Sequence, residues 1–337
     1  MRASLFSLAS LASLALGAPS LTLKRENGAT ATQAELDKFK LYAQWAAAAS
    51  CNSEKSPGEP IACQEEQCTT LESHQAVVAG SFTGLLTDSR GFVGIDHVDK
   101  VIVLSFRGSV SVRNWIADLI LIQVPCTLTP FCLVHAGFLA SYNEIAKPAL
   151  AALASARAAN PTYRVVTTGY SLGAAVATLA AANLRKSSPS DSIDLITFGS
   201  PRVGNGAFAK FVTGQKGEEY RLTHKDDPVP RLPPIIFNYR HTSPEYWFDP
   251  GSDKEVSLDE VQVCLGHANI SCNAATEGLN MDTHGWYFQG LAGCYPESMP
   301  FKRDEASDAE LAAKLTEWAR EDVALAANLV SEGEFDA

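Results

Sequence analysis

The chain has 337 residues, of which 46% are hydrophobic and 19% charged, and its formal net charge is −11 at pH 7. An acidic chain is a poor ligand for nucleic acid, so we expect no nucleic-acid partner. Residues 34–300 contain no low-complexity linker and no internal repeat, which favours one globular domain over two small ones.

The first 18 residues have the pattern of a secretory signal peptide. Arg2 precedes an uncharged stretch rich in Leu and Ala, which ends in the small residues Gly17 and Ala18. Residues 19–25 form a candidate propeptide that ends in Lys24-Arg25. Since no other stretch is long and apolar enough to span a bilayer, we expect a secreted, extracellular protein.

The main domain, residues 26–303, alternates strand patterns with helix patterns. A first helix is predicted from Thr32 to Cys51, with Thr32 to Glu35 as its start signal. Strands that alternate with helices predict an α/β fold whose central sheet is largely parallel. The expected strands are 76–81, 91–96, 101–106, 163–168, 193–198 and 220–223, and the further helices are 136–159, 174–185 and 205–212.

Eight cysteines in an exported chain predict up to four disulfides. Zinc binding is the rival interpretation, but no pair has C-x-x-C spacing and an oxidising compartment disfavours it. We expect no metal and no cofactor. Asn269-Ile270-Ser271 is an N-glycosylation sequon. Spacing pairs Cys63 with Cys68, Cys126 with Cys132 and Cys264 with Cys272, and leaves Cys51 and Cys294 to join the ends of the domain.

The pentapeptide Gly169-Tyr170-Ser171-Leu172-Gly173 lies between a predicted strand and an alanine-rich predicted helix. This setting is typical of a nucleophile elbow, in which the serine occupies a strained turn between strand and helix. A serine hydroxyl needs a histidine to accept its proton and a carboxylate to orient that histidine. Ser171 is therefore the candidate nucleophile.

The carboxylate and the histidine should follow the serine in that order. Asp227 ends the last predicted strand in a loop, and Pro228 behind it favours an extended backbone. Asp226 is a close competitor. The histidines that remain as candidates for the base are His241, His267 and His284, and composition alone does not choose among them.

The ordered set of motifs resembles the secreted filamentous-fungal triacylglycerol lipases, the class 3 lipases. The resemblance covers about residues 34–294 and implies an α/β-hydrolase fold, a Ser171, Asp227 and His284 triad, and the four disulfides given above. Most members have histidine where this chain has Tyr170. The segments that carry the resemblance are 106–109, Asn114-Trp115, 169–173, 199–205, 227–234, 243–247 and 284–288.

Two further features of an ester-hydrolysing site are expected beside the elbow. The Leu172 N–H, at the start of the elbow helix, is one candidate oxyanion donor, and Ser109 resembles the second donor of the family. Residues 110–120 predict an amphipathic helical lid over the active site. Its apolar residues, with the acyl-chain wall expected after Asp227, are Val112, Trp115, Ile116, Leu119, Ile120, Ile235 and Ile236.

The acidic tail, residues 304–337, has the pattern of an amphipathic helix. It carries ten acidic and two basic residues and follows the dibasic pair Lys302-Arg303. Ser307 and Glu310 predict a capping box at its start. We expect the tail to cover the active-site crevice or lid and restrain activity until it is removed. The residues on its apolar face are Leu311, Leu315, Trp318, Leu325 and Leu329.

Together these features predict a secreted, monomeric lipase that hydrolyses acylglycerols at a lipid–water interface by double displacement, with peripheral lipid contact only. An esterase of soluble aryl or short-chain esters, as in the related feruloyl esterases, is the alternative within enzymes. A catalytically silent lipid-binding protein on the same fold is the alternative outside them.

Overall fold

The computed structural model describes residues 30–294 and 305–331. The predicted signal peptide, the candidate propeptide and Lys302-Arg303 lie outside the described residues. Within the described ranges, no helix is long and apolar enough to cross a membrane.

A mixed sheet of eight strands forms the centre of the molecule, in the order β1-β2-β3-β6-β7-β8-β9-β10. The pairs from β3 to β9 are parallel, and the outer pairs are antiparallel. The predicted α/β class with a largely parallel sheet is thus confirmed. The strands are β1 Val77–Thr83, β2 Arg90–Asp96, β3 Val101–Phe106, β6 Arg164–Tyr170, β7 Ile193–Phe198, β8 Glu219–His224, β9 Glu245–Phe248 and β10 Val261–Cys264.

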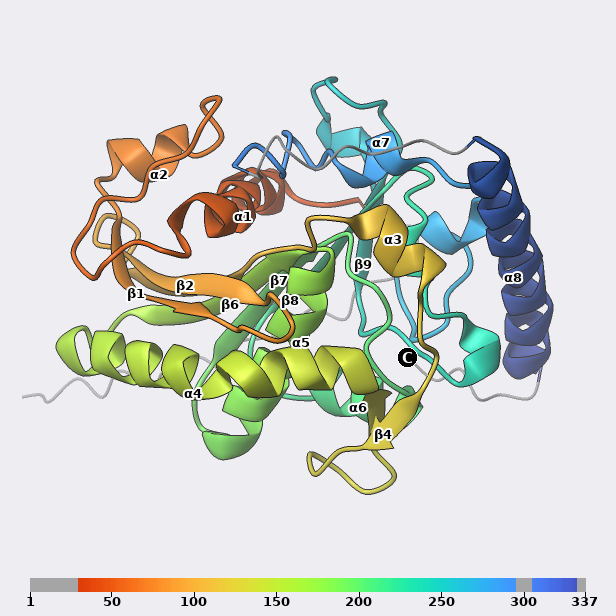
Figure 1. Cartoon of the computed structure of the whole chain (residues 1–337), viewed down its shortest axis with the longest axis horizontal. Helices are drawn as coiled ribbons and strands as arrows, with labels where there is room; N and C mark the ends of the chain where they lie inside the picture. The colour runs from red at the N-terminus through yellow and green to blue at the C-terminus, as the bar shows by residue number, and fades with distance from the viewer. Residues whose placement is uncertain (1–29, 295–304, 332–337) are drawn as a thin grey trace, which may run out of the picture.

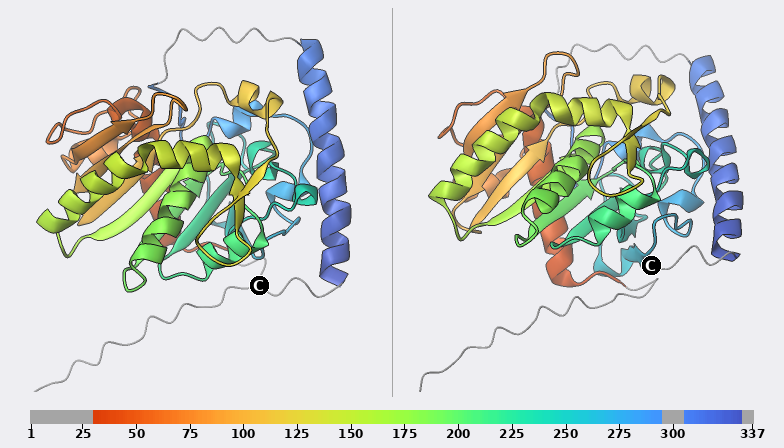
Figure 2. Two further views of the ribbon diagram at one scale, coloured as in Figure 1. Left: turned by 60° about the horizontal axis from the view of Figure 1, so that its bottom comes forward. Right: turned by 90° about the horizontal axis from the view of Figure 1, so that it is seen from below.

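Helices cover both faces of this sheet (Figures 1 and 2). On one face lies α1, Gln33–Asn52, which begins with the predicted capping box of Thr32 and Glu35. On the other face lie α4, Ala136–Ala159, and α5, Leu172–Ser187. The alanines of α5 are buried, and their small side chains let the helix lie close to the strands.

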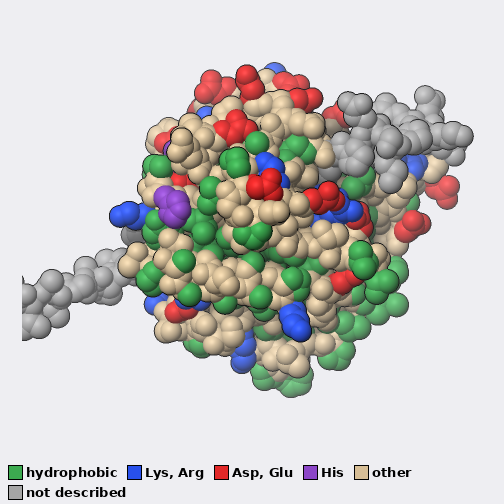
Figure 3. Space-filling view, turned by 60° about the vertical axis from the view of Figure 1, so that its left-hand side comes forward, with side chains coloured by type: hydrophobic (Ala, Val, Ile, Leu, Met, Phe, Trp, Pro, Cys, Tyr) green, Lys and Arg blue, Asp and Glu red, His purple; other side chains and the backbone are tan. Residues whose placement is uncertain are grey.

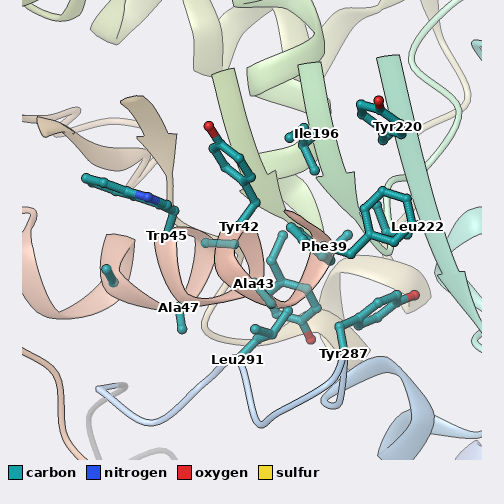
Figure 4. Packing of buried hydrophobic residues seen from close by; sticks show 14 of the residues in the cluster. Phe39, Tyr42, Ala43, Trp45, Ala47, Ile196, Tyr220, Leu222, Tyr287 and Leu291 are labelled. Carbon is teal, nitrogen blue, oxygen red and sulfur yellow. The ribbon is translucent and has the colours of Figure 1, made fainter. Parts of the chain in front are cut away.

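Alternate residues of the central strands feed two apolar clusters, one on each face. Val101 and Val103 belong to the cluster under α1, whereas Ile102 and Leu104 belong to the cluster under α4 and α5. This period of two follows from the pleat of a strand. Figure 4 shows the α1 cluster, in which aromatic residues of the helix pack against β7, β8 and the segment near residue 290; the labelled members include Phe39, Tyr42, Trp45, Ile196, Tyr220, Leu222, Tyr287 and Leu291.

Shorter elements connect the strands and helices of the domain. They are α2 Thr69–Ser73, α3 Val112–Ala117, β4 Gln123–Pro125, β5 Leu133–His135, α6 Gly206–Thr213, α7 Met281–His284, and the 3₁₀ helices η1 Val229–Arg231, η2 Ile235–Phe237, η3 Leu258–Glu260 and η4 Asn273–Ala275. The β4 and β5 strands form a separate hairpin.

The tail forms one long helix, α8, Glu305–Ser331, which packs along the side of the domain (Figure 2). The predicted capping box at Ser307 is wrong because the helix already begins at Glu305. Ser307 lies inside the helix and accepts a hydrogen bond from Arg113 instead. The predicted apolar face is correct in direction: Leu311 and Leu315 are buried, and Trp318, Leu325 and Leu329 are half-buried.

All eight cysteines form disulfides in the structure. The bridge between Cys51 and Cys294 joins the end of α1 to the segment beyond α7, across 243 residues of sequence. It therefore fixes both ends of the main domain to each other. The four pairs are those expected from the sequence, namely Cys51–Cys294, Cys63–Cys68, Cys126–Cys132 and Cys264–Cys272.

Candidate active site

Ser171 lies in the tight turn between β6 and α5. Its backbone has φ 56° and ψ −125°, a strained conformation for a residue with a side chain. Gly173 explains how closely α5 approaches the neighbouring strand, because a Cβ atom there would lie 2.2 Å from the Phe106 carbonyl oxygen. The sequence therefore places the start of α5 directly against the loop that leads to Ser109.

Three predicted side chains from distant parts of the sequence meet at this turn. The Nε2 atom of His284 lies 2.9 Å from the Ser171 hydroxyl oxygen, and its Nδ1 atom lies 2.8 Å from an Asp227 carboxylate oxygen. His284 ends α7, and Asp227 follows β8. All three side chains are buried, so bulk water does not compete for these hydrogen bonds.

Further donors surround the Asp227 carboxylate. The Val229 N–H donates to Oδ1 at 2.9 Å, and the Tyr287 hydroxyl donates to Oδ2. Burial and the neighbouring Asp227 carboxylate raise the pKa of Tyr287 well above its ordinary value, so the phenol keeps its proton and remains a donor. These bonds orient the carboxylate toward the His284 ring.

The alternative candidates are engaged elsewhere. Asp226 accepts hydrogen bonds from the Asn280 side chain. His241 bonds the Pro230 carbonyl, and the His267 ring bonds the His241 carbonyl. Burial lowers the pKa of His241 well below its ordinary value, and burial also lowers the pKa of His267. Neither Asp226 nor these two histidines is within hydrogen-bonding contact of Ser171.

Three residues that shape the site were given no role in it from the sequence. Tyr287 lies three residues beyond the end of α7, and only the folded chain brings its hydroxyl to the Asp227 carboxylate. Gly199 has φ +56°, and a Cβ atom there would lie 3.0 Å from both the His284 ring and the Asp227 carboxylate. The Tyr170 ring packs beside the His284 ring, tilted by 33°, with 4.7 Å between ring centroids.

A cavity of about 770 Å³ opens beside Ser109, Tyr170 and His284. Val112 of α3 lines it, and so do Ala309 and Ala312 of α8. The predicted wall residues Ile235 and Ile236 do not line this cavity. They belong to η2, which packs against α8 instead, with the Ile236 N–H donating to Asp322 at 3.1 Å.

The predicted lid helix is present but shorter than its pattern, since α3 spans only Val112–Ala117. Val112 and Ile116 are buried in a cluster with Val229, Leu232 and two leucines of α8, and Leu119 packs against the same cluster. Trp115 is half-buried and stacks on Phe138 of α4. Ile120 lies beyond the helix and is exposed, so it is not part of the apolar face as predicted.

The predicted oxyanion donors come from the start of α5 and from the loop that follows β3. Leu172 is the first residue of α5, where helical N–H groups have no partner within the helix. Ser109 lines the cavity, and its hydroxyl accepts a hydrogen bond from the Ser111 N–H at 3.3 Å. Both groups are therefore near the place where an ester carbonyl would meet Ser171.

One group in the described part of the chain has ligand atoms close enough for a metal ion, namely His74, Asp96 and Asp99. It lies at the β2–β3 turn, at the opposite end of the sheet from Ser171. His74 and Asp96 bond each other directly at 2.7 Å. This cluster takes no part in the chemistry of the elbow.

A strained serine, a histidine in contact with it and a buried carboxylate behind that histidine define a hydrolase site of the serine type. A family model described as lipase (class 3) matches residues 103–237. The chain is 50% identical over 294 residues to secreted mono- and diacylglycerol lipase 1 of Fusarium solani, covering 87% of each chain. The protein belongs to the class 3 lipase family.

Solved structures of fungal lipases share the fold. The mono- and diacylglycerol lipase of Aspergillus oryzae has a TM-score of 0.74 at 36% identity, over 78% of this chain and 99% of that one. The triacylglyceride lipase of Rhizomucor miehei has a TM-score of 0.70 at 31% identity, over 79% and 99%. The α/β-hydrolase fold expected from the resemblance is confirmed.

The hydrogen bond from the Tyr287 hydroxyl to the Asp227 carboxylate can be tested by substitution. A Tyr287→Phe variant loses a hydrogen bond to the charged Asp227, so kcat/KM for a soluble p-nitrophenyl ester should fall about 10- to 100-fold. The matched control is Tyr163→Phe, which removes the hydroxyl that contacts His97 near the amino end of β6. Equal rates for the Tyr287 variant and the wild type would refute the orienting role of the phenol.

Proposed function

We propose that this chain is a secreted lipase that hydrolyses ester bonds of acylglycerols through an acyl-enzyme on Ser171. The observation that carries the proposal is the hydrogen-bond chain from Ser171 through His284 to Asp227, beside a cavity under α3. Relatives are named for mono- and diacylglycerols in Fusarium solani and for triacylglycerides in Rhizomucor miehei. The proposed substrate is therefore the acylglycerol class as a whole.

The residues divide the reaction between two half-reactions. In the first, the Ser171 oxygen attacks the ester carbonyl carbon while His284 Nε2 takes its proton, and the glycerol oxygen leaves with that proton as its bond to the acyl carbon breaks. In the second, water attacks the acyl carbon, gives a proton to His284, and the fatty acid leaves as Ser171 regains its proton. Asp227 holds the ring and stabilises its charged form.

Negative charge on the carbonyl oxygen requires donors that are already in place. The Leu172 N–H and Ser109 would supply them, each contributing about 3 kcal/mol to the transition state. The close approach of α5 to the loop after β3, which Gly173 permits, sets the distance between these two donors.

In this conformation α3 buries Val112 and Ile116 over the site. Opening α3 would expose these side chains to water, whereas a lipid surface would accept them, so opening should be coupled to the interface. The alternative esterase of soluble aryl or short-chain esters would not need this coupling. We expect the enzyme to act as a monomer in peripheral contact with lipid, with a glycan on Asn269.

Rates on tributyrin across its solubility limit test the proposal. A lipase gated by α3 should show a steep rise in rate when droplets appear, because the surface stabilises the open state. Saturation of the rate below the solubility limit would favour the esterase. A Ser171→Ala variant should fold normally and lose turnover by at least about 1,000-fold; substantial residual hydrolysis would reject Ser171 as the nucleophile.

We further propose that α8 restrains the lid. Leu311 and Leu315 pack on Val112 and Ile116, and Arg113 of α3 pairs with Asp308 of α8. At the middle of the helix, Arg202 and Asp322 form a buried ion pair at 2.8 Å. The Arg202–Asp322 pair holds α8 on the domain, and opening of α3 would break the contacts of Val112, Ile116 and Arg113 with α8. Removal of the tail after Arg303 should therefore lower the free energy of opening.

Removal of residues 304–337 should therefore raise the rate of hydrolysis at a small tributyrin interfacial area by at least about 10-fold, since Leu311 and Leu315 no longer stabilise the closed position of α3. An Asp322→Asn variant should give a similar gain, because the buried Arg202 loses its partner and favours the undocked helix. The exposed neighbour Glu321→Gln is the control. Equal rates for the full-length and trimmed proteins would dispose of the restraint.

A further inference from the structure

The turn between β1 and β2, residues 84–89, carries two adjacent leucines in full contact with solvent. Leu85 is 92% exposed and Leu86 is 94% exposed. Apolar side chains are not spread evenly over the surface: in the view of Figure 3 they gather toward the lower right, and acidic side chains gather at the top. Two adjacent leucines with almost no intramolecular contact do not contribute to the stability of the monomer.

The backbone of this turn is nevertheless firmly held. Glu144 of α4 accepts hydrogen bonds from the Leu86 N–H at 2.7 Å and from the Thr87 N–H at 2.9 Å. These bonds, that from Leu86 first, lower the pKa of Glu144 below its ordinary value, so its carboxylate is ionised at neutral pH. The leucines are therefore presented by a fixed turn rather than by a loose loop.

The turn is also tied to the active-site edge. Arg107 donates to the Asp88 carbonyl at 2.8 Å and to its carboxylate at 2.5 Å. Arg107 leads through Gly108 to Ser109. The strand register places the turn at the same end of the sheet as the elbow, because Gly91 pairs with Phe106 and Phe106 pairs with Gly169. Figure 1 shows the turn at the end of the sheet nearest to α3.

The exposure of Leu85 and Leu86 contrasts with the burial of the apolar face of α3. The apolar face of α3 is buried against the domain and α8, so it is not available for a first contact with lipid. Leu85 and Leu86 are available without any rearrangement. The two leucines are almost fully exposed on a firmly held turn, and the only charge within the turn, Asp88, is paired with Arg107 and Arg90. Such a tip suits a fluid surface, which deforms around it, better than it suits a protein partner, which would need a matching pocket.

We propose that residues 84–89 form a lipid-anchoring prong that inserts Leu85 and Leu86 into the acylglycerol surface before α3 opens. The inference rests on the proposed lipase function and adds a second, lid-independent contact with the substrate phase. Because Arg107 couples the prong to the loop of Ser109, insertion also orients the catalytic edge toward the lipid.

The test compares a Leu85→Ser/Leu86→Ser variant with the wild type in three assays. Loss of two inserted leucines should weaken partition to vesicles of dioleoylphosphatidylcholine and dioleoylglycerol by at least about 10-fold, with a matching loss of rate on emulsified tributyrin. The rate on dissolved p-nitrophenyl butyrate should not change. Val98→Ser is the control, since Val98 is 61% exposed at the opposite end of the sheet, in the β2–β3 turn.

A second variant makes insertion visible. Leu86→Trp should bind the same vesicles at least as tightly as the wild type, and the fluorescence of the added tryptophan should shift to the blue on binding. The fluorescence of the tryptophan added by Val98→Trp should not shift. Unchanged partition of the double serine variant overturns the proposal. So does an equal loss on the dissolved ester, which would make the turn a support of the site, or a change in oligomeric state on size exclusion, which would assign the leucines to a second copy.

Different results would reject the proposed lipase function and the proposed prong. If neither the full-length wild type nor the protein trimmed after Arg303 binds these vesicles or hydrolyses emulsified tributyrin, acylglycerol lipase activity itself is rejected. If the wild type does both and the double serine variant behaves identically, only the prong is rejected.

Discussion

The buried carboxylate of Asp227 needs hydrogen-bond donors, and much of this structure serves to bring those donors to it. Asp227 is fully buried, and a buried charge without partners costs several kcal/mol. Its oxygens are met by His284, Tyr287 and the Val229 N–H. Two of these partners come from the segment around α7, which must therefore fold back across the ends of β6 and β8. The Cys51–Cys294 disulfide fastens the chain just beyond that segment.

The surface around the site is divided between a part that keeps it shut in water and a part that is ready for lipid. Val112 and Ile116 are buried with Leu311 and Leu315, so the closed state gains apolar burial from both α3 and α8. Leu85 and Leu86 remain exposed at the same edge. In this account Leu85 and Leu86 contact lipid first. The apolar face of α3 then leaves α8 and packs against the lipid.

The sequence predicted the elements with strong local patterns and missed those fixed by distant contacts. The bounds of β3, β7 and α4 match the prediction because each is a long helix or a continuous buried run. The β9 strand was missed because it begins with Glu245, a charge that only its buried pairing with Arg221 of β8 explains. The elbow and the order of its partners were readable, whereas the contacts of Tyr287 with Asp227 and of Ser307 with Arg113 join segments that no local pattern relates.

Covalent labelling with a p-nitrophenyl phosphonate, followed by peptide mapping, tests the central claim most directly. The account predicts one adduct, on Ser171, and an Asp227→Asn variant that folds but labels at least about 100-fold more slowly, because its histidine is no longer held in the correct tautomer. An adduct on another residue, or a wild-type labelling rate for the Asp227 variant, would contradict it.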